Sequence, residues 1–155
     1  MRRRMGKGAL LVAVVVLAIG AFLLPTASSQ VTGQTLNLNF PKSAPDYLTG
    51  SDAPGLGDVF YFKGSITDES GASVGHMFAT APLFARNPVR GQVTATITLG
   101  SDSLDLIGEL NFEAADQGTI SVVGGTGIYD GALGSAVVTA DLDTGNINID
   151  ITLLP

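Results

Sequence analysis

A glycine-rich segment, GGTGIYDGALG from Gly124 to Gly134, is the stretch whose residue types and spacing most suggest chemistry. Glycine-rich loops bind phosphate when a strand leads into them and a helix leaves them, because backbone N–H groups then face the anion. A dinucleotide fingerprint starting at Gly125 would need a glycine at the position of Asp130, and no Lys follows the last glycine as a P-loop requires. The segment after Gly134 is also too short and too rich in β-branched residues to form a crossover helix. The segment therefore predicts a tight connection between strands, in which glycines adopt positive φ angles or allow close backbone approach.

Other residues that could catalyse a reaction have too few partners in the sequence. His76 is the single histidine, so neither a catalytic triad nor a histidine-rich metal site can be assembled, and a packed or surface residue is expected. Asp143, Thr144 and Gly145 have the letters of an aspartic protease motif, but that mechanism needs two carboxylates that share a proton. A hairpin turn explains these three residues better. No cofactor and no metal site are expected.

The first 29 residues differ from all that follow. Three arginines and Lys7 precede an apolar run over residues 9–24, which is followed by Pro25 and small residues up to Ser29. This order is typical of a secretory signal, and mass spectrometry should then find an N-terminus between Ala27 and Gln30. The run is long for a signal and slightly short for a membrane span, so an uncleaved anchor is the alternative. Either outcome predicts an extracellular or cell-envelope protein that touches a membrane only through this segment.

Residues 30–155 are expected to form a single domain without disulfides, because they are few enough for one core and the chain has no Cys. Four of the eight Lys and Arg residues and none of the 14 Asp and Glu residues lie in the leader, so the remainder carries a net charge of −10. Such a surface repels phosphate backbones, which excludes nucleic acid as an expected partner.

The hydrophobic periodicity after the leader is two, which is typical of strands. In GQVTATITLG, Val93, Ala95 and Ile97 alternate with threonines. The pattern and the turn signals between segments predict an all-β fold of eight strands, and no amphipathic helix. The predicted strands cover residues 33–40, 58–67, 73–80, 90–99, 103–113, 117–123, 134–142 and 146–154.

Eight sequential strands with short connections predict an antiparallel barrel, because closure removes the unpaired edges. The interior of such a barrel can be filled by side chains or can hold one small ligand. The alternation leaves open which face points inward. The polar series could line the lumen while the apolar series serves a subunit interface, or the reverse.

Two segments resemble the barrels of plant allene oxide cyclases and dirigent proteins. The glycine-rich segment, Gly124 to Gly134, is similar to one shared by both groups, and residues 56–83 are similar to their second hairpin, with Asp68 near the turn. Together they cover roughly half of the chain after the leader. The resemblance implies an eight-stranded antiparallel barrel with an apolar cavity, frequently trimeric, that holds a reactive hydrophobic molecule in one folded shape.

The chemistry implied by the resemblance is only partly matched. Plant cyclases have a Glu and an Asn two apart on the first strand, where this chain has Asn37 and Asn39. Their Asn on the second strand corresponds to Gly64, and their Tyr before the last glycine to Leu133. The Arg and the Asp pair of dirigent proteins are also missing. The resemblance therefore implies the barrel without the catalytic residues of either reaction.

Three functions from different classes remain. The first is a secreted barrel that binds a small hydrophobic molecule without changing it. The second is a cyclase or isomerase that holds a reactive substrate in a near-attack shape. The third is a structural or adhesive cell-envelope protein with a filled barrel. The candidate ligand-binding residues for the first two are Asn37, Asn39, Phe60, Tyr61, Phe62, Phe78 and Tyr129.

Overall fold

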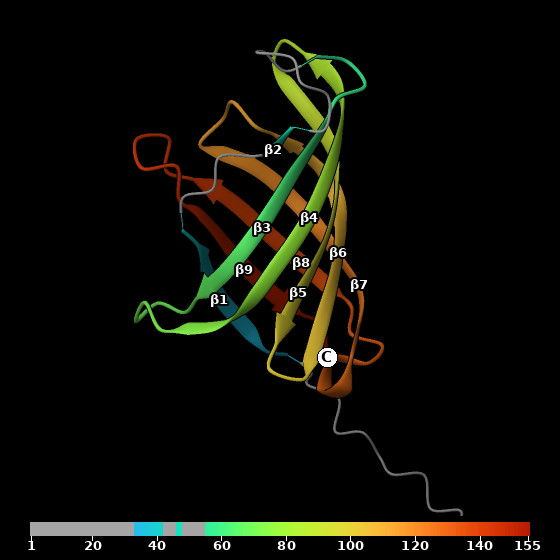
Figure 1. Ribbon diagram of the computed structural model, residues 1–155. Helices are drawn as coiled ribbons and strands as arrows, with labels where there is room; N and C mark the ends of the chain where they lie inside the picture. The colour runs from blue at the N-terminus through green and yellow to red at the C-terminus, as the bar shows by residue number, and fades with distance from the viewer. Residues whose placement is uncertain (1–32, 42–45, 48–54) are drawn as a thin grey trace, which may run out of the picture.

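The protein folds into a closed, almost purely β structure in the computed structural model, which describes residues 33–41, 46–47 and 55–155 (Figure 1). The predicted leader lies outside the described residues. The barrel strands are β1 (Thr35–Phe40), β3 (Val59–Thr67), β4 (Ser73–Arg86), β5 (Val89–Leu99), β6 (Asp102–Asn111), β7 (Asp116–Thr126), β8 (Gly134–Ala140) and β9 (Ile147–Leu153). A two-residue strand, β2 (Asp46–Tyr47), and a short 3₁₀ turn, η1 (Gly127–Tyr129), complete the described elements. No helix in these ranges is long and apolar enough to cross a membrane.

Eight of the strands form the barrel, as predicted. The antiparallel order runs β1-β9-β8-β7-β6-β5-β4-β3, and a pairing of Asn39 on β1 with Thr67 on β3 closes the ring. The short β2, which the sequence pattern did not predict, adds to β3 through the pairs Asp46 with Tyr61 and Tyr47 with Phe60. Closure leaves few unpaired strand edges, which is the physical advantage expected of a barrel.

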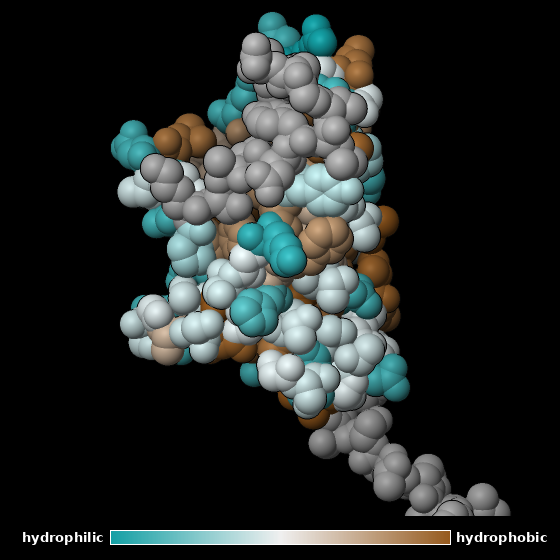
Figure 2. Space-filling view, viewed as in Figure 1, coloured by the Kyte–Doolittle hydropathy of each residue, from teal (hydrophilic) through white to brown (hydrophobic). Residues whose placement is uncertain are grey.

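The apolar series points inward, which decides between the two orientations that the sequence left open. On β5, Val93, Ala95 and Ile97 are buried, while the threonines between them are exposed. The same alternation gives a continuous core of side chains from all eight barrel strands. Neutral and hydrophilic residues cover most of the outer face seen in Figure 2. Burial of the apolar face is therefore the main force that closes this barrel.

The hairpin of β4 and β5 is longer than predicted and extends past one end of the barrel (Figure 1). The prediction that β4 ends at residue 80 is wrong, because the alternation continues through buried Ala81 and Leu83. Pro82 does not break the strand because the β4–β5 ladder is irregular there, with a register shift between Leu83 and Ala85. A proline, which has no N–H to donate, is tolerated at such irregular positions.

The Asp-Thr-Gly motif lies in a hairpin turn, as predicted. The Asp141 carboxylate accepts hydrogen bonds from the backbone N–H groups of Asp143 and Thr144, at 3.0 and 3.2 Å, and Gly145 has a φ of 75°. Hydrogen bonding to Thr144, side chain first, and to the backbone of Asp143 lowers the pKa of Asp141. These contacts show that the motif stabilises the β8–β9 turn and does not supply a catalytic pair of carboxylates.

Candidate functional site

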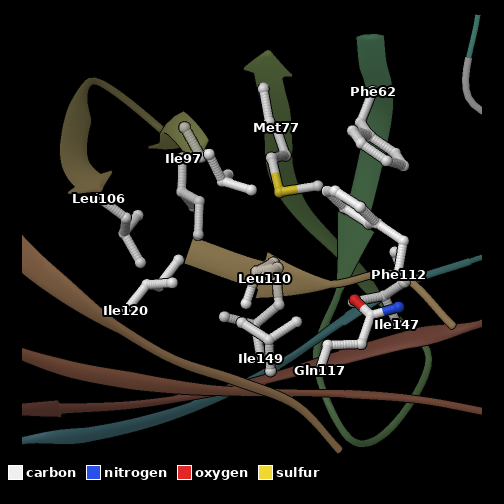
Figure 3. Close-up of a pocket in the computed structure, with 14 residues that line it drawn as sticks. Phe62, Met77, Ile97, Leu106, Leu110, Phe112, Gln117, Ile120, Ile147 and Ile149 are labelled. Carbon is white, nitrogen blue, oxygen red and sulfur yellow. The ribbon is translucent and has the colours of Figure 1, made fainter. Parts of the chain in front are cut away.

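The lumen contains an apolar cavity of about 40 Å³ that runs from the middle of the barrel towards one end. We call this end, where β6 ends and β7 and β9 begin, the mouth. Figure 3 shows the side chains around the cavity, which come from the seven strands β3 to β9 and from the β6–β7 turn. Its lining comprises Phe62, Met77, Ala79, Val93, Ala95, Ile97, Leu106, Leu110, Phe112, Gln117, Ile120, Val138, Ile147 and Ile149. None of these described side chains is ionisable.

Aromatic rings gather at the mouth. Phe112 follows β6 in the turn and is half-buried, with its ring stacked on Phe62 at a centroid distance of 6.0 Å and an angle of 21°. Phe60 meets Phe112 edge-on, at 5.1 Å and 73°. Each such pair contributes about 0.5–1.5 kcal/mol beyond its buried area. Phe62 and Phe112 line the cavity, so the three rings form an apolar cluster at this end of the lumen.

Among the described residues that line this cavity, Gln117 alone has a polar side chain. Its side chain is 8% exposed, and its Oε1 has no hydrogen-bond partner among the described residues. A β-bulge causes this placement, because Asp116 pairs with Thr139 and Gly118 with Val138, so that Gln117 is the extra residue. Gly118 has a φ of 135°, which favours glycine in the bulge. In Figure 3 the amide of Gln117 points towards Phe112.

Two of the predicted ligand-binding residues, Phe60 and Phe62, are buried inside the barrel. Phe62 lines the cavity itself, and Phe60 supports the aromatic group at the mouth. Tyr129 is also buried, but it belongs to η1 at the opposite end and does not line the cavity. Burial and, secondarily, the negative charge of Asp102 raise the pKa of the Tyr129 phenol, so it is neutral at physiological pH. The structure thus separates Tyr129 from the other two.

The expectation that Phe78 lines the cavity is wrong, because its side chain is 49% exposed on the outer face of β4. Tyr61 lies beside it, with ring centroids 5.9 Å apart. Strand alternation explains both positions, since Phe60 and Phe62 take the inward sites on β3 and Met77 takes the inward site next to Phe78. A role of either residue in ligand binding stays a prediction.

Asn37 and Asn39 also point away from the lumen, because Leu36, Leu38 and Phe40 occupy the inward positions of β1. Asn37 donates a hydrogen bond to the Glu69 carboxylate at 2.6 Å. Asn39 donates to the backbone carbonyl of Asp68 at 3.3 Å. Both asparagines therefore connect β1 to the β3–β4 turn, near the seam that closes the barrel.

The glycine-rich segment serves close packing, as predicted. Gly127 has a φ of 65°, which confirms the expected positive angle. A Cβ at Gly125 would collide with the carbonyl oxygen of Ser103, and one at Gly127 with the Asp102 carboxylate. That carboxylate stands where a phosphate would have to approach, and η1 is only three residues long. The segment thus lacks both the charge and the helix of a phosphate site.

Among the described residues, ionisable side chains do not line the cavity. Arg90 and Glu109 form an ion pair of 3.1 Å on the surface, and the exposed His76 contacts Ser65 at 3.5 Å. Within the described ranges, no three His, Asp or Glu side chains come together in a group that could hold a metal ion.

Sequence reasoning missed Phe112 and Gln117 as site residues. Phe112 continues the inward series of β6, so periodicity alone could have identified it. Gln117 could not be found in that way, because strict alternation would place it on the outer face with Thr119 and Ser121. The available signal was Gly118, since a glycine within a strand often marks a bulge.

Comparisons with known proteins find similarity to solved structures only. No protein family model matches this sequence, and no curated protein matches it. Among solved structures, the chain is similar to a pyocyanin demethylase, with 19% identity, a TM-score of 0.66 and coverage of 77% of this chain and 99% of the other. It is also similar to a pterocarpan synthase dirigent protein, with 15% identity, a TM-score of 0.60 and coverage of 77% and 87%.

A third similar structure is described as a nonspecific heme-binding cyclase that catalyses a [4 + 2] cycloaddition during neoabyssomicin biosynthesis. It shares 16% identity with this chain at a TM-score of 0.62, and the match covers 99% of this chain and 79% of the other. These similarities confirm the allene oxide cyclase and dirigent-like barrel as the fold. Similarities at such low sequence identities establish a shared fold and do not establish a shared activity.

Proposed function

We propose that this protein is a secreted barrel that binds a small hydrophobic molecule in its lumen and admits it through the mouth. The observation that carries this proposal is an apolar cavity that ends in stacked aromatic rings and a single unpartnered amide. Ligand sites in proteins have this composition, with mostly apolar walls and a few oriented polar groups. The similarity to barrels named as a dirigent protein and a cyclase supports the same class of function.

Binding is favoured over acid–base catalysis. The described residues that line the cavity include no carboxylate, imidazole or phenol that could transfer a proton. Asn37, at the place of the cyclase carboxylate, lies outside the lumen and carries no charge. Any guidance of a cyclisation or isomerisation would come from the shape of the lumen alone. Allene oxide cyclised in the presence of the protein should therefore show no strong enantiomeric excess by chiral chromatography.

Ligand entry requires movement at the mouth. The cavity of about 40 Å³ is well below the volume of roughly 300 Å³ or more of drug-sized pockets. Phe112 is the lining residue best suited to move, because it is only half-buried and belongs to a turn. Displacing its ring gives up two aromatic contacts, at about 1–3 kcal/mol in total. We therefore expect a ligand to enter the lumen when the side chain of Phe112 is displaced.

The variant Phe112→Ala tests this account. Without the ring, a ligand no longer has to break the aromatic contacts, so affinity should rise about tenfold. The measurement is a fluorescence titration with the neutral probe N-phenyl-1-naphthylamine. We expect the wild-type protein to bind it in the micromolar range, equivalent to about −8 kcal/mol.

Phe84→Ala is the matched control, because Phe84 is 50% exposed on the outer face of β4. The affinity of Phe84→Ala for the probe should equal that of the wild type. Equal changes in both variants would mean that the probe binds the outer surface, and the proposal of a ligand in the lumen would have to be abandoned.

A second candidate function, a structural or adhesive cell-envelope protein, is favoured by one observation. The lumen is nearly filled, with room for only a few water-sized spheres in about 40 Å³. A barrel that serves only as a support would show no saturable probe binding in either the wild type or Phe112→Ala. That result separates the two functions.

Secretion and assembly are further parts of the proposal. Mass spectrometry of the extracellular protein should find the cleaved N-terminus between Ala27 and Gln30, while an intact Met1 in a membrane fraction would indicate an anchor. A homotrimer is proposed from the resemblance, and sedimentation equilibrium measures it directly.

A further inference from the structure

We infer that Gln117 is the anchor for the lumen ligand and selects molecules that carry one hydrogen-bond donor, a hydroxyl or N–H group, on an otherwise apolar body. This inference rests on the proposed function and adds to it the chemical class of the ligand. The residue lines the cavity, is buried to more than nine-tenths, and leaves its Oε1 without a partner among the described residues.

The backbone is specifically arranged to direct this side chain inward. Without the bulge, Gln117 would share the outer face of β7 with Thr119 and Ser121 and would be hydrated. The bulge and the positive φ of Gly118 turn it into the lumen instead. Bulges are common next to binding sites because they redirect one side chain without disturbing the rest of the strand.

The unpartnered oxygen is unfavourable in the empty barrel. A buried acceptor without a hydrogen bond destabilises a protein, because it has lost its hydration and gained no partner. A water molecule is a poor substitute, because an ordered buried water needs two to four polar partners and the rest of this lining is apolar. A ligand donor removes the penalty, so the barrel binds such a ligand more tightly than an isostere that lacks the donor.

The geometry also excludes some ligands. A molecule whose only polar atom is an acceptor could pair only with the amide Nε2 and would leave the buried Oε1 without a partner. Charged ligands are disfavoured, because none of the described residues that line the cavity carries an opposite charge. The class is therefore a neutral, mainly apolar molecule with a single hydroxyl or N–H group at the end that reaches Gln117.

Three bicyclic probes of nearly equal size test the inference. Indole has an N–H donor and no strong acceptor, benzofuran has an oxygen acceptor and no donor, and indene has neither. Their affinities are measured by displacement of N-phenyl-1-naphthylamine from the full-length protein. The wild type should bind indole about tenfold more tightly than indene or benzofuran, since one satisfied buried hydrogen bond has that effect.

Gln117→Met removes the amide and keeps the volume. The variant should bind the three probes with equal affinity, and its melting temperature without ligand should rise by about 2–6 °C because the unpartnered oxygen is gone. Thr119→Val, at an exposed position of the same strand, is the control and should keep the preference for indole.

The outcomes distinguish the inference from the function on which it rests. Equal binding of all three probes by the wild type would overturn the anchor role of Gln117 while leaving a ligand-binding lumen intact. A preference for indole that persists in Gln117→Met, or a lower melting temperature of that variant, would also overturn it. Failure of the wild type to bind any probe would overturn both proposals.

Discussion

Replacing Gly125 by Ala is expected to lower the free energy of unfolding by about 3 kcal/mol or more. A Cβ at this position would overlap the carbonyl oxygen of Ser103 and would lie 2.9 Å from both the Cβ and the carbonyl oxygen of Tyr129. Two of these atoms belong to the backbone and cannot move without shifting β6 or η1. The strand pairing of Leu104 with Gly125 is therefore the feature that the substitution disturbs.

Gly124→Ala is the matched control, since no atom lies within 4 Å of a Cβ built at Gly124 and its φ is not positive. Its stability should stay within about 0.5 kcal/mol of the wild type. Urea denaturation of the three proteins measures both effects. If the two variants were equally stable, the glycines would not be needed for close packing, and the structural explanation of the glycine-rich segment would fail.

Leu106→Ala is expected to lower the free energy of unfolding by about 2–5 kcal/mol and to enlarge the lumen at the same time. Leu106 is 1% exposed and lines the existing cavity, so the space it leaves joins that cavity. A small apolar molecule should then bind more tightly and restore part of the loss. At a tenfold excess of indene over its dissociation constant, the recovered stability is about 1.4 kcal/mol.

Leu104→Ala provides the comparison, because Leu104 lies on the same strand, is fully buried and does not line the cavity. Its loss of stability should be similar, but indene should not recover it. Thermal unfolding with and without indene distinguishes the two variants. Equal recovery in both would show that any hole in this core accepts the probe, and the cavity would have no special role.

The fold could be predicted from the sequence because most strands follow a strict alternation. The residues around Val93 and Ile97 have one apolar face, and turn signals separate the strands, so the number and order of barrel strands follow directly. The direction of the apolar face did not follow, because alternation marks two faces without saying which is enclosed. The length of β4 did not follow either, because Pro82 lies within the strand, in an irregular part of the β4–β5 ladder.

The candidate site was predicted less well, for a physical reason that differs between residues. Phe60 and Phe62 obey the alternation and lie inside, as expected. Phe78 is a candidate because it is aromatic, but its parity on β4 places it outside. Gln117 enters the lumen only because a bulge reverses its parity, and single-residue bulges depend on the pairing partner rather than on local sequence.

The central claim is that a small apolar molecule binds inside the lumen, and the methyl group of Met77 reports on this most directly. Met77 is buried in the lining of the cavity, and the other two methionines are Met1 and Met5, far from it in sequence. Carbon-13 labelling of the methionine and isoleucine methyl groups gives a signal for Met77 that an aromatic ring nearby will shift. The account predicts a saturable shift of this signal on titration with indole. A Met77 signal that does not move while the methyl groups of the exposed Ile107 and Ile128 shift would contradict it, because the ligand would then lie on the outer surface.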